Sequence, residues 1–194
     1  NRGRLIACDA DKGRLEEASR RLRRAGVANA ETRVLSSARD KWVKRHKNSF
    51  DVVFVDAPCS GSGTWRRNPD AKWRFTEQDL EELAALQAEI LDSACRLVRP
   101  GGRLVYATCS LLHRENEEQV AKFQSAHDDF SIVPIRQAWS SVFGENAPDL
   151  ELAEEVETLT LTPARHGTDG FFVAVMERAK EPEAAASDIA DAAH

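Results

Sequence analysis

Short apolar runs alternate with amphipathic stretches along the first half of the chain. Runs at 4–8, 32–36 and 51–56 are bounded by charged or polar residues and predict buried strands. The run at 51–56 is apolar on both faces, which is typical of a central strand in a parallel sheet. A helix is predicted over 12–25, because apolar residues recur on one face and Gly26 follows as a stop signal.

The second half continues this order. Thr76, with Asp79 three residues later, resembles a capping box and predicts a long helix that runs to about Val98. The remaining predictions follow along the chain: a strand over 103–108, a helix over 115–126, a short strand over 130–135, an irregular acidic segment over 136–155, an antiparallel hairpin of 157–163 with 170–178, and a disordered tail over 179–194.

Strands that alternate with helices predict an α/β fold whose sheet is mostly parallel and closes with an antiparallel pair. In such sheets, ligands bind beyond the carboxyl ends of the strands. Asp9, Asp56 and Cys109 each stand at or just past a predicted strand end. We therefore expect these three reactive side chains at one edge of the sheet.

At 194 residues the chain is long enough for one domain, and its 42% hydrophobic and 30% charged residues are ordinary for a globular protein. No apolar run approaches the roughly 18 residues of a membrane span. The N-terminus shows no signal-peptide pattern. These features predict a cytoplasmic protein without a membrane contact.

Four cysteines occur: Cys8, Cys59, Cys95 and Cys109. None forms a C-x-x-C pair, and His113 is the only histidine close to any of them in the sequence, so no metal site is predicted. A disulfide framework is not expected in a chain of this size without a secretory signal. Cys8 and Cys95 suit the role of small buried hydrophobic side chains. Cys59 and Cys109 follow strand ends and are candidates for chemistry.

Charge is distributed unevenly. Residues 145–194 hold 12 acidic and 3 basic residues, whereas residues 1–144 hold 20 acidic and 24 basic ones. The stretch 20–47 carries ten basic residues and suits either a solvated helix face or a nucleic-acid contact. A second cluster interleaves cations with Trp65 and Trp73, a pairing that suits phosphate contacts and base stacking. Its candidate nucleic-acid ligands are Arg66, Arg67, Lys72 and Arg74.

Asp9 ends the first predicted strand, where an acidic residue commonly accepts hydrogen bonds from ribose hydroxyls. The alternative is a helix N-cap, a role open to both Asp9 and Asp11. In the nucleotide-binding arrangement, a glycine-rich turn lies about 20 residues before the acidic residue. Only eight residues precede Asp9. We therefore expect that the first strand and its glycine-rich loop are absent, and that residues 1–178 are part of a larger catalytic domain.

Two short motifs carry the candidate chemistry. D-A-P-C-S at 56–60 places an acid and a thiol in one tight turn, and T-C-S at 108–110 places a second thiol after the next strand. A thiolate is a strong nucleophile once its pKa is lowered or a base assists it. Two thiols and the Asp56 carboxylate could attack an electron-poor ring, protonate it and later release it. The chemistry alone does not decide which thiol attacks.

At this point the sequence resembles a known family. DAPCSGSGTWRRNPDAKW at 56–73 and PGGRLVYATCSLLHRENEEQV at 100–120, with DGFF at 169–172, are similar to the Fmu/Sun family of RNA cytosine 5-methyltransferases. The resemblance implies a Rossmann-like class I fold, S-adenosylmethionine as cofactor and RNA as partner. It implies that Cys109 attacks carbon 6 of a cytosine, that Cys59 helps to release the methylated RNA, and that Asp56 lies near ring nitrogen 3.

The resemblance also implies a set of cofactor-binding residues: Asp9, Ser37, Asp56, Ala57 and Pro58. The chain departs from the family where the third strand of the domain usually ends in an acidic residue near the adenine. Ser36 or Ser37 stands at that place, and Asp40 is a possible substitute.

Ribosomal RNA is the expected substrate, tRNA is the alternative, and a monomer is expected. A non-catalytic RNA-binding remnant is a second reading, because the glycine-rich loop is absent. An adenine or small-molecule methyltransferase on the same fold is a third. It is disfavoured because it needs no thiol and usually carries an Asp/Asn-Pro-Pro-aromatic motif where this chain has DAPC.

Overall fold

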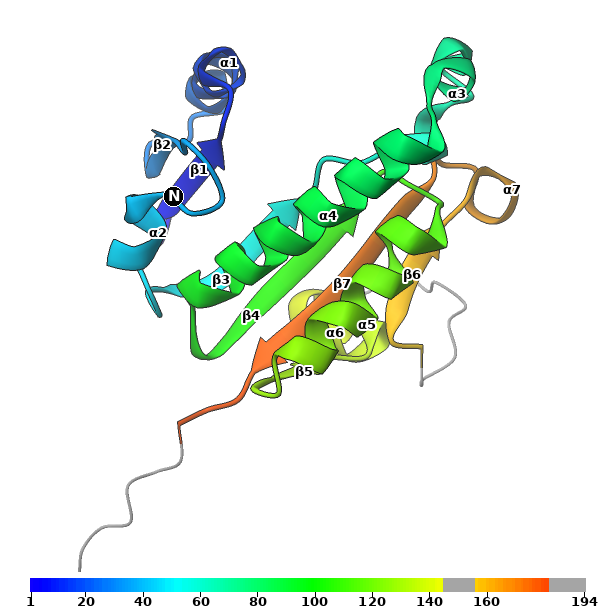
Figure 1. The fold of residues 1–194 in the computed structure, drawn as a ribbon. Coiled ribbons are helices and arrows are strands. Elements are labelled where there is room, and N and C mark those ends of the chain that lie inside the picture. The colour runs from blue at the N-terminus through cyan, green and yellow to red at the C-terminus, as the bar shows by residue number, and fades with distance from the viewer. Residues whose placement is uncertain (145–155, 182–194) are drawn as a thin grey trace, which may run out of the picture.

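The computed structural model describes residues 1–144 and 156–181 (Figure 1). Its helices and strands are β1 (Leu5–Asp9), α1 (Lys12–Arg24), β2 (Ala30–Val34), α2 (Lys41–Arg45), β3 (Phe50–Asp56), α3 (Pro69–Arg74), α4 (Glu77–Ala94), β4 (Val98–Thr108), α5 (Glu117–Ala126), β5 (Phe130–Ile132), α6 (Ile135–Phe143), β6 (Thr158–Leu161), α7 (Pro163–His166) and β7 (Phe171–Arg178). Short 3-10 turns lie between them: η1 (Ser62–Thr64), η2 (Cys95–Leu97) and η3 (His113–Glu115).

The strands form two separate pieces of sheet. β1 and β2 pair in parallel. The larger piece has the order β3-β4-β7-β5, and β6 also pairs with β7. β3 and β4 are parallel, whereas β7 is antiparallel to β4, β5 and β6. The predicted parallel strands and the predicted hairpin of β6 with β7 are both present, and together they make a mixed sheet (Figure 1).

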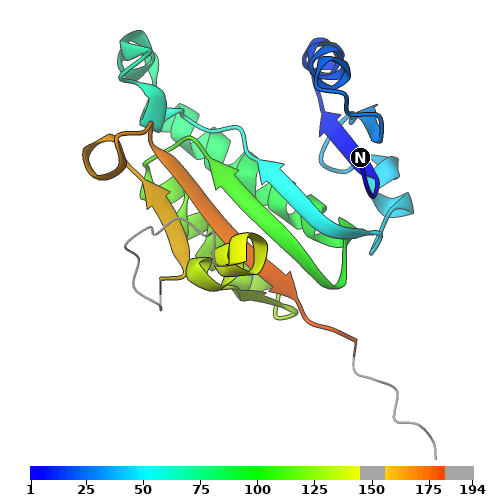
Figure 2. The same cartoon turned by 180° about the vertical axis from the view of Figure 1, so that it is seen from behind.

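Helices cover both faces of the larger sheet. α4 and α5 lie on one face (Figure 1), and α6 lies on the other (Figure 2). The main core lies between the sheet and helices α4 and α5. Its members include Leu91, Leu104, Tyr106, Phe123 and Met176. Burial of apolar surface stabilises a fold by about 25 cal/mol per Å². This layer therefore fixes β3 and β4, whose carboxyl ends carry the predicted site.

α4 begins at the predicted capping box. The Asp79 N–H donates to the Thr76 hydroxyl (3.2 Å), and the Thr76 N–H donates to Asp79 Oδ2 (2.8 Å). The helix ends at Ala94 rather than near Val98, because η2 follows it. β4 then starts at Val98, earlier than the predicted residue 103, and includes the Pro-Gly-Gly sequence beside an irregularity in the β3–β4 register.

The prediction of an irregular segment over 136–155 is wrong in its described part. Residues up to Phe143 form α6, whose Ile135 and Ala138 are buried against Leu159 and Val175. The sequence analysis missed the apolar spacing of this short helix, because the acidic stretch that follows dominated the interpretation of the whole segment. Residues 145–155 lie outside the described residues, as does most of the predicted tail. Within the described part, no helix is both long and apolar enough to span a bilayer.

One face of β3 is uncovered by the described part of the chain. Val52 is 57% exposed and Phe54 is 61% exposed, whereas Val55 packs into the core. The predicted burial of both faces is therefore wrong for the described residues, where β3 pairs only with β4. Cys8 is likewise exposed rather than buried, because its strand pairs only with β2 there.

A candidate active site with two cysteines

β3 and β4 bring two cysteine-containing loops to the same edge of the sheet. The parallel register places Asp56 opposite Ala107. The loop after β3 (residues 57–61) and the loop after β4 (residues 109–112) therefore start side by side, at the edge to which both arrowheads point in Figure 1. The sulfur atoms of Cys59 and Cys109 lie 3.4 Å apart. The structure thus brings together the two cysteines that the sequence singled out.

The two thiols differ in how readily they ionise. The hydrogen bond with the Cys59 thiol lowers the pKa of Cys109 to about 7, against burial and the negative charges of Asp56 and Glu115, which raise it. The same hydrogen bond, together with burial, raises the pKa of Cys59. The two pKa shifts therefore run in opposite directions, toward the thiolate for Cys109 and toward the thiol for Cys59.

Backbone contacts hold the two loops against each other. The Ala57 N–H donates to the Ala107 carbonyl (2.9 Å), and the Gly63 N–H donates to the Cys109 carbonyl (3.0 Å). The Gly170 N–H, just before β7, donates to the Gly63 carbonyl (2.9 Å). A Cβ at Gly63 would lie 2.4 Å from the Gly170 carbonyl oxygen, so only glycine permits this approach.

The Asp56 carboxylate lies at this edge and is exposed. Its charge acts on the Cys109 thiol, and it has no hydrogen bond or ion pair within the described residues. It is therefore available to a ligand that enters beside the two sulfurs.

Sequence reasoning missed the polar residues beneath the cysteines. Ser60, Gln87, Ser110, Glu115 and Asn116 form a hydrogen-bonded cluster, and four of them are at most 1% exposed. Their signal was a glutamine on the apolar face of a predicted helix and the charged R-E-N-E-E run just after T-C-S. A fully buried carboxylate such as Glu115 is rare unless hydrogen bonds compensate for its burial.

The predicted cofactor residues lie at or just past the ends of strands. Asp9 ends β1, and one of its oxygens accepts a hydrogen bond from the Asp11 N–H (2.8 Å). Asp11, not Asp9, caps α1. After β3, Ala57 is buried, and the Pro58 carbonyl accepts a hydrogen bond from Gln87 Nε2 (2.9 Å).

The loop after β2 contains the serines and the substitute acid. Ser36 donates its N–H and its hydroxyl to Asp40 Oδ2, at 2.9 and 2.8 Å. The other Asp40 oxygen caps α2 through the Trp42 N–H. These hydrogen bonds, the one from the Ser36 backbone first, lower the pKa of Asp40 to about 2. Within the described residues, the Ser37 hydroxyl accepts one hydrogen bond, from the Arg39 N–H (3.2 Å). Asp40 therefore serves to hold the loop, and Ser37 is the freer side chain.

The basic loop (residues 61–75) extends from the same edge and includes α3 (Figure 1). Of its four predicted RNA ligands, Arg66 and Arg67 pair with Asp169, at 3.6 and 2.7 Å. Lys72 lies over the Trp73 ring, 5.7 Å from its centroid, and the Trp73 side chain is 82% exposed. Arg74 has no partner within the described residues. The end of α3 therefore presents two cations and an aromatic ring to solvent.

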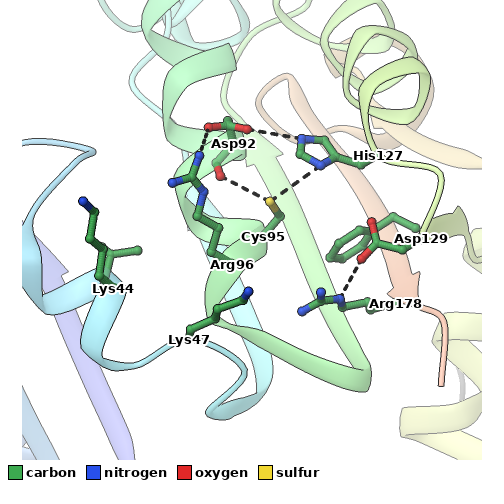
Figure 3. Close-up of a pocket in the computed structure, with 10 residues that line it drawn as sticks. Lys44, Lys47, Asp92, Cys95, Arg96, His127, Asp129 and Arg178 are labelled. Atoms are coloured by element: carbon green, nitrogen blue, oxygen red, sulfur yellow. Dashed lines mark hydrogen bonds and ion pairs between the residues drawn. The ribbon is translucent and has the colours of Figure 1, made fainter. Parts of the chain in front are cut away.

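A third cysteine lies beside a histidine at the opposite end of α4. Ligand atoms of Asp92, Cys95 and His127 lie within 4.8 Å of one another, beside a cavity of about 420 Å³ (Figure 3). The sequence did not associate His127 with a cysteine, because 31 residues separate them. Burial and the charge of Asp92 raise the pKa of Cys95 to about 11.

The charges around this cavity disfavour a cation. Arg96 forms an ion pair with Asp92 (2.8 Å). Arg178 lies beside the cluster and forms an ion pair with Asp129 (2.8 Å). Lys44 and Lys47 line the same cavity without an ion pair in the part of the chain that is described (Figure 3). We assign no metal ion to this cluster, and Cys95 fills the buried position that the sequence predicted.

The mixed sheet, with its candidate chemistry beyond the carboxyl ends of parallel strands, has the class I methyltransferase fold. Two solved structures share it. The protein PH0851 has a TM-score of 0.77 and 35% identity, over 91% of this chain and 37% of that one. NSun6 from Pyrococcus horikoshii, solved with SFG, has a TM-score of 0.69 and 27% identity, over 93% of this chain and 42% of that one.

The family model of the 16S rRNA methyltransferase RsmB/F matches residues 1–177, and the chain belongs to this family. The ribosomal RNA small subunit methyltransferase B of Shewanella oneidensis is 36% identical over 177 residues. That match covers 91% of this chain, which spans 38% of the length of that relative. The family resemblance read from the two cysteine motifs is thereby confirmed.

Proposed function

We propose that this chain carries the reacting residues of an S-adenosylmethionine-dependent RNA cytosine carbon-5 methyltransferase that acts on ribosomal RNA. The observation that carries the proposal is the pair of sulfurs 3.4 Å apart beside the Asp56 carboxylate. Methylation of an exocyclic amine requires no thiol, so this pair favours attack on a pyrimidine ring over the adenine alternative.

Each reacting group has one role. The Cys109 thiolate adds to carbon 6 of the cytosine, which forms a carbon–sulfur bond and makes carbon 5 nucleophilic. Asp56 donates a proton to ring nitrogen 3 as negative charge develops on the ring, and takes it back when the adduct breaks down. After carbon 5 has gained the methyl group, its proton passes to a base, the electron pair left behind restores the double bond between carbons 5 and 6, and the carbon–sulfur bond breaks to return the Cys109 thiolate. We assign that release to Cys59, and the 3.4 Å distance between the two sulfurs supports this assignment.

Residues of the chain fit part of a cofactor site. Asp9 has one carboxylate oxygen without a hydrogen bond in the described part of the chain, at the end of β1, where ribose hydroxyls are commonly bound. The proposed contacts are those of Asp9, Ser37, Asp56, Ala57 and Pro58. S-adenosylmethionine supplies an electrophilic methyl group when it is bound.

The proposed substrate is an unpaired or extruded cytosine, because its ring carbons are not accessible within a helix. Lys72 and Arg74 bind flanking phosphates, and Trp73 offers a stacking surface. Arg66 and Arg67 reach phosphate only after they exchange Asp169 for it. Ribosomal RNA is favoured because the curated relatives are named as ribosomal RNA methyltransferases.

The domain proposal is that residues 1–178 form part of a longer catalytic domain, whose upstream segment supplies another strand and the glycine-rich loop. The split sheet and the uncovered face of β3 support it. A monomer in the cytoplasm stays a prediction of the sequence.

A covalent adduct tests the reaction. The protein with its upstream segment is incubated with S-adenosylmethionine and ribosomal RNA transcribed with 5-fluorocytidine, whose fluorine cannot leave as the carbon 5 proton does. We expect a protein–RNA adduct on a denaturing gel, and its loss in Cys109→Ser.

The variants distinguish the alternatives. An adduct that persists in Cys109→Ser but disappears in Cys59→Ser would reverse the roles of the two cysteines. An adduct with a tRNA transcript but not with ribosomal RNA would change the substrate. If no variant and no RNA gives an adduct, the chain binds RNA without catalysis or methylates another group.

A further inference from the structure

Glu115 is a charged side chain at the centre of the polar cluster beneath the cysteines. It ends η3 and is 0% exposed. A carboxylate in such a place requires several hydrogen bonds to compensate for the loss of water. Its partners therefore show what the residue is held against.

Both oxygens of Glu115 accept hydrogen bonds from the loops that carry the cysteines. Oε1 accepts from the Ser60 N–H (2.8 Å) and from Gln87 Nε2 (3.1 Å). Oε2 accepts from the hydroxyls of Ser60 and Ser110. Ser60 follows Cys59 and Ser110 follows Cys109, so one carboxylate is bonded to the neighbour of each cysteine.

The other end of this arrangement is fixed by packed elements. Gln87 lies on the buried face of α4 and also donates to the Pro58 carbonyl (2.9 Å). The buried Tyr106 hydroxyl of β4 donates to the Glu115 carbonyl (2.6 Å). Glu115 thus links a helix and a strand of the core to both loops, whereas the Ser60–Ser110 hydroxyl contact (3.2 Å) joins the loops only to each other.

We propose that Glu115 is a positioning residue that holds the two cysteine loops at the separation at which their sulfurs are hydrogen-bonded. The hydrogen bonds that hold the loops do not depend on the proposed function, whereas the effect of Glu115 on methylation rests on it. Because two sulfurs act in turn on one base, a displacement of either loop lowers the rate even when both thiols are present.

The first test compares Glu115→Gln with Glu115→Ala in the protein with its upstream segment. A glutamine oxygen can replace Oε1, and its amide group can donate to the two serine hydroxyls, which rotate to accept. Alanine removes the acceptor of all four hydrogen bonds that Ser60, Gln87 and Ser110 donate to Glu115. Glu118→Ala is the matched control, because Glu118 is partly exposed and, in the part of the chain that is described, its side chain bonds His113 alone.

The measurement is the pH dependence of Cys109 alkylation by iodoacetamide, followed by mass spectrometry. The groups that act on this thiol are Cys59, Asp56 and Glu115 itself. Glu115→Ala separates the sulfurs, removes the hydrogen bond from Cys59 and raises the midpoint. Glu115→Gln keeps that hydrogen bond and removes a negative charge, so its midpoint stays or falls. Glu118→Ala leaves the midpoint unchanged.

These directions separate positioning from charge. If Glu115 acted only through its charge, both substitutions would lower the midpoint of Cys109 together, and the proposal would be overturned. Should Glu115→Ala fail to fold, Ser110→Ala replaces it, because it removes the hydrogen bond that joins Glu115 to the Cys109 loop. A midpoint in Ser110→Ala equal to that of the parent protein would also contradict the proposal.

Methyl transfer to ribosomal RNA is the second measurement. We expect Glu115→Ala to lower kcat roughly 100-fold with a smaller change in KM, and Glu115→Gln to restore most of the rate. If the parent protein transfers no methyl group while the alkylation midpoints shift as expected, the proposed function fails and the positioning role stands. A Glu115→Ala variant with the raised midpoint and an undiminished kcat would show that the positioning does not matter to the reaction.

Discussion

Cys59 and Cys109 occupy similar positions after adjacent strands, yet their surroundings make them different acids. Burial and the nearby carboxylates Asp56 and Glu115 oppose ionisation of Cys109. Hydrogen bonds outweigh them, first that with the Cys59 thiol and then one from the backbone of Cys109 itself, so the pKa of Cys109 is lowered. This difference supports the proposal that Cys109 is the nucleophile, a choice that the sequence motifs alone left open.

Removal of the Cys59 hydrogen bond should suppress the ionisation of Cys109. In the parent protein, we expect the rate of Cys109 alkylation to rise with pH to a plateau, with a midpoint near 7. In Cys59→Ala, only the backbone hydrogen bond of Cys109 still opposes burial and the two carboxylates, so the midpoint should rise to about 8.5, the ordinary value for a thiol, or above it. Iodoacetamide labelling at a series of pH values measures both.

Cys59→Ser is the matched control for that experiment, because its hydroxyl can still donate to the Cys109 sulfur. Its midpoint should lie nearer that of the parent protein than that of Cys59→Ala. Equal midpoints in Cys59→Ala and the parent protein would show that Cys59 does not stabilise the thiolate.

At the scale of elements, a glycine contact joins the basic loop to the start of β7. Gly63→Ala would place a methyl carbon 2.4 Å from the Gly170 carbonyl oxygen, and the three nearest atoms are all backbone atoms of Gly170. We expect it to destabilise the protein by about 3 kcal/mol through overpacking, which lowers Tm by roughly 6–12 °C. Calorimetry of the two proteins measures this change.

Gly13→Ala is the control for the glycine contact. A Cβ there meets only the Asp11 side chain, at 3.1 Å, and the position is helical. Alanine favours a helix over glycine by about 1 kcal/mol, so Tm should stay or rise slightly. A Gly63→Ala protein as stable as the parent would mean that the two backbones do not meet as described.

The elements with strong local signals were predictable from the sequence. β3 and β4 are apolar runs, α4 starts at a capping box, and the positions of Cys59 and Cys109 after strand ends follow from these elements. The contact of Glu115 with Ser60 was not predictable, because it depends on packing between segments 55 residues apart. The charged run after T-C-S is typical of an exposed helix start, and only the tertiary structure buries one of its carboxylates.

The position of β7 shows the same limit. The sequence predicted a hairpin of β6 and β7, and this pair exists. β7 pairs with β4 on one side and with β5 on the other. No local sequence pattern predicts these two neighbours. This position of β7 brings Gly170 against Gly63. It also brings Asp169 into ion pairs with Arg66 and Arg67, which the sequence analysis had assigned to RNA.

For the whole molecule, the uncovered face of β3 is the feature that remains unexplained by the described residues. Soluble proteins scatter single apolar side chains on their surface, but Val52 and Phe54 lie two residues apart on a strand directly before the site. Residues two positions apart on a strand point to the same face of the sheet. A layer from the proposed upstream segment would cover this face and extend the sheet toward β1.

Phe54→Ser should therefore destabilise the longer protein and leave the stability of residues 1–194 nearly unchanged. In the protein with its upstream segment, the substitution removes a buried aromatic ring and should destabilise the fold by about 3 kcal/mol or more. In residues 1–194 expressed alone, the ring is exposed, so the substitution should leave stability within about 0.5 kcal/mol and should reduce aggregation. Urea unfolding of both lengths measures the difference, and Val142→Ser, at a residue of α6 that is 71% exposed, should change neither. Equal destabilisation of both lengths by Phe54→Ser would place the covering layer within the chain itself, and no destabilisation of the longer protein would leave the face open to another partner.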